Sequence, residues 1–287
     1  MKVIVTGGSG FLGSHVADEL TKSNHEVTIF DRKKSNWRTK NQKMFVGNLL
    51  NKKHLENVIK KADVVFHFAA LADLDKALNK PVDSININIL GTVNVLELCK
   101  KHNIKRFVHA SSIYVNSSEG GFYRSSKKAA EDYIEEYNKN YGLKYTILRF
   151  GSLYGKRSDD TNGVRKIVKG AVKNGKIIYG GSKNSVREYV HVIDAAKACV
   201  HILKKKYENK HINITGKKKI KVSTFLSKLS KMTNISKKIE HSIKKDTGHY
   251  TVSPFTFKPK KAKKFIFKSS INFNDGLMEL INELQGS

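Results

Sequence analysis

The sequence has few of the residues that mark disulfide-bonded, metal-binding, disordered or membrane-spanning proteins. Its two cysteines, Cys99 and Cys199, are too far apart for a disulfide framework or a C-x-x-C metal site. Three prolines and 39% hydrophobic residues exclude a low-complexity chain. No apolar run approaches the roughly 18 residues of a membrane span, and a strand-like run from Lys2 predicts no signal peptide. We therefore expect a soluble, cytoplasmic, globular protein with no membrane partner.

Acidic residues are also scarce relative to basic ones. The chain has 54 Lys and Arg against 25 Asp and Glu, which gives a formal net charge of +29. The excess is densest in residues 201–287, with 20 Lys and Arg against 6 Asp and Glu. A basic chain is typical of nucleic-acid-binding proteins. However, these lysines are dispersed and few aromatic residues lie among them, so solvated faces are the favoured interpretation and nucleic acid an unlikely partner.

The first 150 residues alternate between short apolar runs and segments of helical period. An alternation this regular predicts a parallel sheet, and strands this apolar are usually buried on both faces. The predicted fold is therefore α/β, a doubly wound (Rossmann) sheet with its ligands at the carboxyl ends of the strands. The expected strands are Val3–Thr6, Val27–Phe30, Met44–Val46, Val64–Phe68, Arg106–Ala110 and Tyr145–Arg149, and the expected helices are Phe11–Lys22, Lys53–Lys60, Val82–Lys101 and Tyr123–Tyr141.

After Gly151 the pattern is less regular and predicts a smaller C-terminal lobe that binds substrate. We expect a first domain at residues 1–152, to whose sheet residues 187–215 return, and a lobe formed mainly by residues 153–287. The elements expected in this part are helices at Gly163–Asn174, Val192–Lys206, Val222–Met232 and Asn274–Leu284, and strands at Ile177–Tyr179 and His211–Ile214.

The first strand runs directly into the glycine-rich turn T-G-G-S-G-F-L-G, and a helix follows. Gly7 suits the tight turn, Gly10 lets the backbone approach a pyrophosphate, and Gly13 lets the helix pack against the strand. The helix N-terminus offers N–H groups and a positive dipole end to the phosphates. Asp31 ends the second strand, where a carboxylate accepts ribose hydroxyls and repels a 2′-phosphate, so NAD is predicted over NADP. Arg32 beside it weakens this discrimination.

Hydroxyl and ammonium groups fall where the reactive end of that cofactor is expected. The fifth strand ends in His109, Ala110, Ser111 and Ser112, which places hydroxyls at the carboxyl edge of the sheet. Tyr123 and Lys127 lie one helical turn apart on one face. A phenol with a pKa of about 10 is a poor base at neutral pH. The Lys127 ammonium and the positive nicotinamide would favour the phenolate and lower the pKa of Tyr123. We predict that Ser112, Tyr123 and Lys127 are catalytic.

With its later motifs, the chain resembles the extended short-chain dehydrogenase/reductases of the nucleotide-sugar epimerase/dehydratase family. The resemblance implies an enzyme of carbohydrate metabolism and a homodimer built on the helices at Val82–Lys101 and Tyr123–Tyr141. The motifs are T-G-G-S-G-F-L-G, H-F-A-A at His67, N-I-L-G-T at Asn88, S-S-I-Y-V at Ser111, Y-R-S-S-K at Tyr123, L-R-F-G-S-L-Y-G at Leu148, R-E-Y-V-H-V-I-D at Arg187 and K-P-K-K-A-K-K-F at Lys258.

The resemblance also implies site residues, and no metal ligands. Arg187 would grip the nucleotide diphosphate, which suits a cation facing phosphate. The cofactor contacts implied or derived are Gly7, Gly10, Phe11, Leu12, Gly13, Asp31, Arg32, Asn48, Leu49, Phe68, Ala69, Ala70, Asn88, Tyr123, Lys127 and Phe150. The substrate contacts are Leu71, Ser111, Ser112, Tyr123, Ser152 and Arg187.

The chain departs from the family pattern directly after Ser112. The 4,6-dehydratases carry an Asp-Glu pair there, whereas this chain has Ile113 and Tyr114, so dehydration lacks its acid and base. The decarboxylases keep the Glu, so that branch is also disfavoured. The loop from Ser112 to Tyr123 is shorter than in most members and borders the sugar, so the sequence does not determine which sugar is bound.

The predicted function is an NAD-dependent epimerase of a nucleoside-diphosphate sugar, with a UDP-sugar favoured, acting at C4 through a 4-keto intermediate. Two alternatives stay open. An NAD(P)H-dependent 4-keto-sugar-nucleotide reductase would use the same three residues. A non-catalytic relative would sense NAD or bind nucleic acid through its basic tail, and salt-sensitive nucleic-acid binding would favour it.

Overall fold

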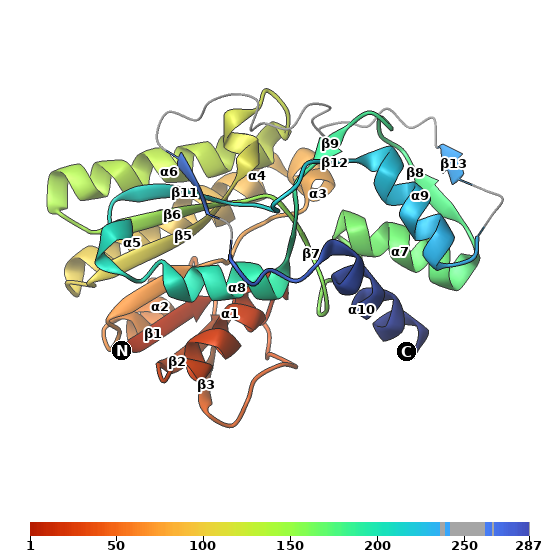
Figure 1. Cartoon of the computed structure of the whole chain (residues 1–287). Coiled ribbons are helices and arrows are strands. Elements are labelled where there is room, and N and C mark those ends of the chain that lie inside the picture. The colour runs from red at the N-terminus through yellow and green to blue at the C-terminus, as the bar shows by residue number, and fades with distance from the viewer. Residues whose placement is uncertain (236–238, 242–261, 266, 287) are drawn as a thin grey trace.

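Short apolar strands form a fully parallel sheet at the centre of the protein. The structure is a computed structural model that describes residues 1–235, 239–241, 262–265 and 267–286. The eight strands are β1 (Lys2–Thr6), β2 (Glu26–Asp31), β3 (Gln42–Val46), β4 (Val64–His67), β5 (Arg106–Ser112), β6 (Tyr145–Phe150), β11 (Lys210–Ile214) and β14 (Ala262–Phe265). Their order is β14–β11–β6–β5–β4–β1–β2–β3, and helices cover both faces (Figure 1). The predicted doubly wound sheet is confirmed.

Alternate side chains of the strands enter two apolar cores, one on each face of the sheet. Val3 and Val5 of β1 pack toward α1 (Phe11–Lys22) and α8 (Val192–His201). Ile4 faces the other way, toward α2 (Lys52–Ile59), α5 (Gly91–Lys101) and α6 (Gly121–Tyr141). This is the two-residue period of a strand, with apolar residues at both phases because both faces are buried. Ligands of such a sheet bind where the carboxyl ends of the strands emerge between the helix layers.

The predicted helix at Val82–Lys101 is not a uniform α-helix. It begins as α4 (Pro81–Ser84), continues as a π-helical segment, η1 (Ile85–Leu90), and then becomes α5. Such wider turns occur frequently at functional sites. The segment carries the buried residue Asn88.

Several predicted elements have different ends in the structure. The β5 strand continues past Ala110 to Ser112, β4 stops at His67, and α6 begins at Gly121, two residues before Tyr123. A short α3 (Leu74–Asn79) follows β4, and a 3-10 turn, η2 (Ile113–Asn116), follows β5. The extension of β5 matters most, because it places Ser111 and Ser112 on opposite faces of the sheet.

A third apolar core lies beside the sheet, among α7 (Gly163–Asn174), α9 (Val222–Met232) and α10 (Phe273–Gln285). Three short strand pairs accompany these helices: β7 (Ser152–Tyr154) with β10 (Tyr189–His191), β9 (Val186–Arg187) with β12 (Ile220–Lys221), and β8 (Ile177–Tyr179) with β13 (Ile239–His241). The chain returns to the central sheet at β11, which pairs with β6. The assignment of residues 1–152 and 153–287 to two domains stays a prediction.

The predicted helix at Val192–Lys206 is too long. α8 ends at His201, and a 3-10 turn, η3 (Lys205–Tyr207), follows. The Tyr207 ring lies 5.8 Å from the His201 ring and 6.3 Å from the Phe265 ring. These aromatic contacts favour a chain path that leaves the helix after His201. Residues 258–261 of the basic motif lie outside the described residues. Within those that are described, no helix is long and apolar enough to cross a membrane.

Candidate active site

The glycine-rich turn between β1 and α1 is packed too closely for side chains. Gly7 has a φ of 73°, and a Cβ atom there would lie 2.5 Å from the Ala69 backbone nitrogen. A Cβ atom on Gly13 would lie 2.2 Å from the Gly7 carbonyl oxygen. Gly10 precedes α1 and provides no side-chain cap, so the first N–H groups of the helix stay available to an anion. This cradle fits a dinucleotide pyrophosphate.

Asp31 at the end of β2 lies against the same turn. Its carboxylate accepts hydrogen bonds from the Ser9 backbone N–H at 3.1 Å and from the Lys33 N–H at 3.2 Å. A carboxylate has further lone pairs beyond these two, so Asp31 fits the predicted role of ribose acceptor. Nearby, the Asn48 side chain accepts from the Leu50 N–H at 3.0 Å and closes the turn after β3. Leu49 is buried, with its carbonyl bonded to the Asn94 amide at 3.2 Å.

Asn88 uses its amide within the protein. Its Oδ1 accepts from the Leu71 N–H at 2.7 Å, and its Nδ2 donates to the Leu71 carbonyl at 3.0 Å and to the Ser126 hydroxyl at 2.9 Å. Ser126 in turn donates to the Tyr123 carbonyl at 2.8 Å. The sequence predicts Asn88 and Leu71 as ligand contacts. In the structure Asn88 joins the loop after β4 to helix α6, and its contact with a ligand stays a prediction.

Ser112, Tyr123 and Lys127 come together at the carboxyl end of β5. The side chains of Tyr123 and Ser112 are hydrogen-bonded to each other. Lys127 is only 3% exposed, and its Nζ donates to the Ala110 carbonyl at 2.7 Å. Phe150 of β6 is in register with Ser112, and its ring lies 6.5 Å from the Phe68 ring, so two predicted cofactor contacts also meet at this edge.

Burial controls the titration of Tyr123 and Lys127. It raises the pKa of Tyr123 to about 12, although the hydrogen bond with Ser112 opposes the shift. Burial also lowers the pKa of Lys127 to about 8, against the attraction of the Glu131 carboxylate. The sequence predicts a lowered Tyr123 pKa. In the protein without a ligand the pKa of Tyr123 is raised, because desolvation dominates and the Lys127 ammonium is directed at the Ala110 carbonyl.

A buried polar network behind these residues was missed by the sequence interpretation. Glu131, fully buried on α6, accepts from the Arg149 Nε at 3.0 Å and Nη2 at 2.6 Å, and from the Ser111 hydroxyl at 2.5 Å. Burial alone would raise the pKa of Glu131, but hydrogen bonds from His211, Arg149 and Ser111 lower it to about 2. Ser111 therefore points away from the predicted substrate cleft. The spacing of Glu131, one turn after Lys127, was the available signal.

The two predicted contacts to the sugar nucleotide lie on the short strands beside the sheet. Ser152 begins β7, and its N–H donates to the Glu188 carbonyl at 3.2 Å. Arg187 lies in β9 and is 8% exposed, with its Nη1 donating to the Val186 carbonyl at 3.2 Å. Residue 152 lies two positions after the last residue of β6, Phe150, which is in register with Ser112, so it lies just beyond the edge that carries Ser112.

The histidines near the site are held neutral. His67 lies between the Thr6 and Thr92 hydroxyls at 2.8 and 3.0 Å. Burial, helped by the charge of Lys127, lowers the pKa of His67 to about 3. The His109 ring lies 5.6 Å from that of His67, and burial lowers its pKa as well. These contacts agree with a structural role for both residues.

The glycine cradle, the acid at the end of β2 and the Ser-Tyr-Lys group after β5 define a dinucleotide-binding protein of the short-chain dehydrogenase/reductase type. A family model described as the NAD dependent epimerase/dehydratase family matches residues 3–215. The chain belongs to this family, and NAD is its cofactor.

Known relatives agree in sequence and in fold. The "Putative UDP-glucose 4-epimerase" of Methanocaldococcus jannaschii is 30% identical, with 99% of each chain aligned. The structure of a Thermus thermophilus UDP-glucose 4-epimerase complexed with NAD has a TM-score of 0.83 at 26% identity, over 100% of both chains. A Thermotoga maritima UDP-glucose 4-epimerase, solved with UDP-glucose, has a TM-score of 0.86 at 24% identity over 100% of this chain and 99% of that one, which shows the same fold.

Proposed function

We propose that the protein is an NAD-dependent 4-epimerase of a nucleoside-diphosphate sugar, with a UDP-sugar as substrate. The observation that carries the proposal is the hydrogen bond between Tyr123 and Ser112 at the carboxyl end of β5, with the Lys127 ammonium buried one turn away. A relative aligned from end to end and a solved structure more than a quarter identical both bear the name UDP-glucose 4-epimerase, which supports this choice.

The side chains at this edge suit a reversible proton transfer at a sugar hydroxyl. Ser112 would hydrogen-bond the oxygen, and Tyr123 would take its proton as a general base. The nearby positive charge of Lys127 stabilises the phenolate that is needed first. Bound NAD supplies a reversible hydride acceptor. After the resulting 4-keto sugar rotates in the cleft, Tyr123 would return the proton to the oxygen as hydride returns to the opposite face of C4, which inverts the configuration at C4.

The surroundings of Ser112 do not support water elimination from the sugar. The next two positions, which the family's dehydratases fill with an acid and a base, are Ile113 and Tyr114. Ile113 is buried, and the Tyr114 ring lies 6.3 Å from the Tyr123 ring in an edge-to-face arrangement. Ile113 has no group that could protonate a leaving hydroxyl, and at position 114 a phenol replaces the carboxylate that would serve as the base.

The test is to incubate the purified protein with UDP-galactose or UDP-glucose and follow their interconversion by NMR. We expect turnover without added NADH, since an epimerase regenerates its NAD. Stoichiometric consumption of NADH or NADPH with a 4-keto sugar nucleotide would instead establish the reductase. No turnover across a panel of UDP-, GDP- and dTDP-sugars would overturn the epimerase proposal.

We also propose that two copies of the chain associate through α4, η1, α5 and α6. Of these neighbouring elements, α4, η1 and α6 expose large apolar side chains, including Ile85 at 54%, Phe122 at 48% and Tyr133 at 47% of their surface. Apolar residues gathered on adjacent helices are typical of a protein interface. The proposed interface leaves the inner face of α6, with Tyr123 and Lys127, directed at the cleft.

A further inference from the structure

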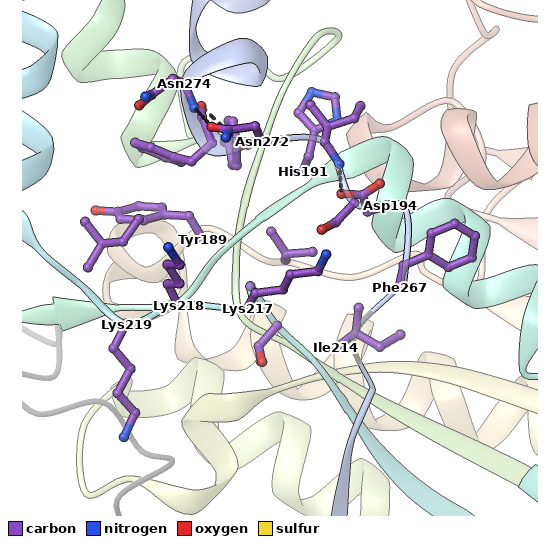
Figure 2. A pocket seen from close by; sticks show the side chains of 18 of the residues that line it. Tyr189, His191, Asp194, Ile214, Lys217, Lys218, Lys219, Phe267, Asn272 and Asn274 are labelled. Carbon is purple, nitrogen blue, oxygen red and sulfur yellow. Dashed lines mark hydrogen bonds between the residues drawn. The ribbon is translucent and has the colours of Figure 1, made fainter.

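A second cavity lies on the opposite side of the sheet from the catalytic tyrosine. Its volume is about 650 Å³, and it is bounded by α8, the segment after β11, Phe267 and residues 270–274 (Figure 2). Asp194 and Ala198 bring α8 to its wall, whereas Tyr123 and Lys127 belong to α6. Figure 1 shows α8 and α6 on opposite faces of the sheet. The cavity is therefore separate from the proposed active site, and its volume is within the usual range for small-molecule sites.

The charge of the cavity wall is strongly positive. The described lining includes Lys217, Lys218, Lys219, Lys221 and Lys228 but only one carboxylate, that of Asp194. In Figure 2 the Lys218 ammonium lies beside the Tyr189 ring, whereas the Lys219 side chain points away. The Lys228 Nζ donates to the Asn274 Oδ1 at 3.2 Å, which fixes a second cation at the wall. Ammonium groups in such an arrangement favour an anionic ligand, above all a phosphate.

Aromatic rings and buried polar atoms complete the wall. Tyr189 packs against Phe273 with ring centroids 5.2 Å apart, and Phe267 lies across the cavity from Tyr189 (Figure 2). Asp194 is 5% exposed, and its Oδ2 accepts from the Ile271 N–H at 2.8 Å. Among the described residues, its Oδ1 has no hydrogen-bond partner, and neither does the hydroxyl of buried Thr215. Buried polar atoms are rarely left unpaired, so we expect the Asp194 Oδ1 and the Thr215 hydroxyl to hydrogen-bond to a ligand in the cavity.

We propose that this cavity is a binding site for a small aromatic or heterocyclic phosphate. The phosphate would contact Lys218 and Lys228, and the ring would lie between Tyr189 and Phe267. A hydroxyl or amide on the ligand would meet Asp194 and Thr215 at the inner end. This site uses none of the residues assigned to NAD or to the sugar nucleotide, and the inference does not rest on the proposed function.

Phenyl phosphate is the simplest probe of this chemistry. Isothermal titration of the NAD-loaded protein with phenyl phosphate should show saturable binding that weakens as salt is added. Ser270→Trp should abolish it, because residue 270 lines the cavity and the indole would fill it. Ser269→Trp is the matched control, since residue 269 is exposed and absent from the lining, and it should bind like the wild type. Equal binding by both tryptophan variants, or none by the wild type, would overturn the proposal.

A second pair of variants tests the phosphate contact without filling the cavity. Lys218→Gln should weaken phenyl phosphate binding by about tenfold or more, because a charge-assisted contact is lost. Lys219→Gln, its neighbour that points away, should change the affinity far less. Phenol, which keeps the ring but not the phosphate, should bind much more weakly than phenyl phosphate. Similar affinities for phenol and phenyl phosphate, or a Lys218→Gln protein that binds normally, would exclude a phosphate site here.

Discussion

At the scale of single residues, one face of one helix carries three titrating groups whose pKa values differ widely. Burial raises the pKa of Tyr123 to about 12 and lowers that of Lys127 to about 8. Glu131 is buried as well, yet its hydrogen bonds lower its pKa to about 2. In the proposed mechanism Tyr123 has to lose its proton, so the charge on Lys127 would decide how readily the phenolate forms.

Removing the Tyr123 hydroxyl should abolish most of the activity while the fold is retained. We expect Tyr123→Phe to lower kcat by about a hundredfold or more, since general acid–base groups contribute at least that much. Circular dichroism and NAD binding should be close to wild type. The control is Tyr133→Phe on the exposed side of the same helix. Full activity in Tyr123→Phe would exclude this residue as the proton-transfer group.

The pH dependence of kcat should report the charge on Lys127. We expect kcat to fall as the pH rises through about 8, because deprotonation removes the positive charge that stabilises the phenolate. Glu131→Gln should move this fall to lower pH, since the carboxylate raises the pKa of Lys127. Glu136→Gln, an exposed change on the same helix, should leave the profile in place. An unshifted profile in Glu131→Gln would show that the carboxylate acts only on stability.

The contrast between Ser111 and Ser112 shows where prediction from sequence ends. The glycine turn and Asp31 could be placed because fixed spacing along the chain determines their geometry. The sequence predicts hydroxyls at the carboxyl end of the fifth strand, so both serines were expected at the cleft. The real strand continues to Ser112, and its alternation directs Ser111 to Glu131 instead. The link from Glu131 to Arg149 joins a helix to a strand, and no local pattern contains it.

At the scale of elements, the π-helical segment Ile85–Leu90 matters because it positions Asn88 against two other parts of the chain. One amide joins the loop after β4, through both backbone groups of Leu71, to Ser126 on α6. Helical periodicity in the sequence predicts one long helix here and gives no sign of the wider turn. The same is true of the end of α8, where packing of the Tyr207 ring overrides the helical pattern.

Replacing Asn88 should weaken the connection between the loop after β4 and α6. We expect Asn88→Ala to lower the free energy of unfolding by about 1–3 kcal/mol, the cost of leaving buried polar partners unpaired. Urea denaturation measures the change. Asn86→Ala lies in the same segment at a half-buried position and should cost less. If both variants were equally stable, the Asn88 hydrogen bonds would contribute little to the fold.

At the scale of the whole molecule, most of the +29 charge lies outside the site that the motifs define. The proposed chemistry uses one buried lysine and one buried arginine. The exposed apolar side chains are more informative than the charge, since several of them lie on α4, η1 and α6. They lead to a prediction about assembly.

A charge on this apolar surface should prevent association. The wild type should scatter light as a particle of twice the chain mass of 32.4 kDa, and Ile85→Glu should scatter as a single chain. Burying an unpaired carboxylate in an interface is strongly unfavourable. Ile178→Glu is the control, because Ile178 is 51% exposed on β8, away from these helices. A wild-type protein of single-chain mass would refute the interface.

Helix α6 carries Tyr123 and Lys127 on its inner side and Tyr133 on its outer side, within one rigid rod of 21 residues. If the outer side contacts a second copy of the chain, each subunit stabilises the α6 helix of the other copy, and that helix positions the proposed catalytic residues. Specific activity would then depend on enzyme concentration, falling on dilution below the dissociation constant and recovering when the protein is concentrated. Assays at nanomolar and at micromolar enzyme would thus measure different populations, and every rate constant would need the concentration at which it was obtained.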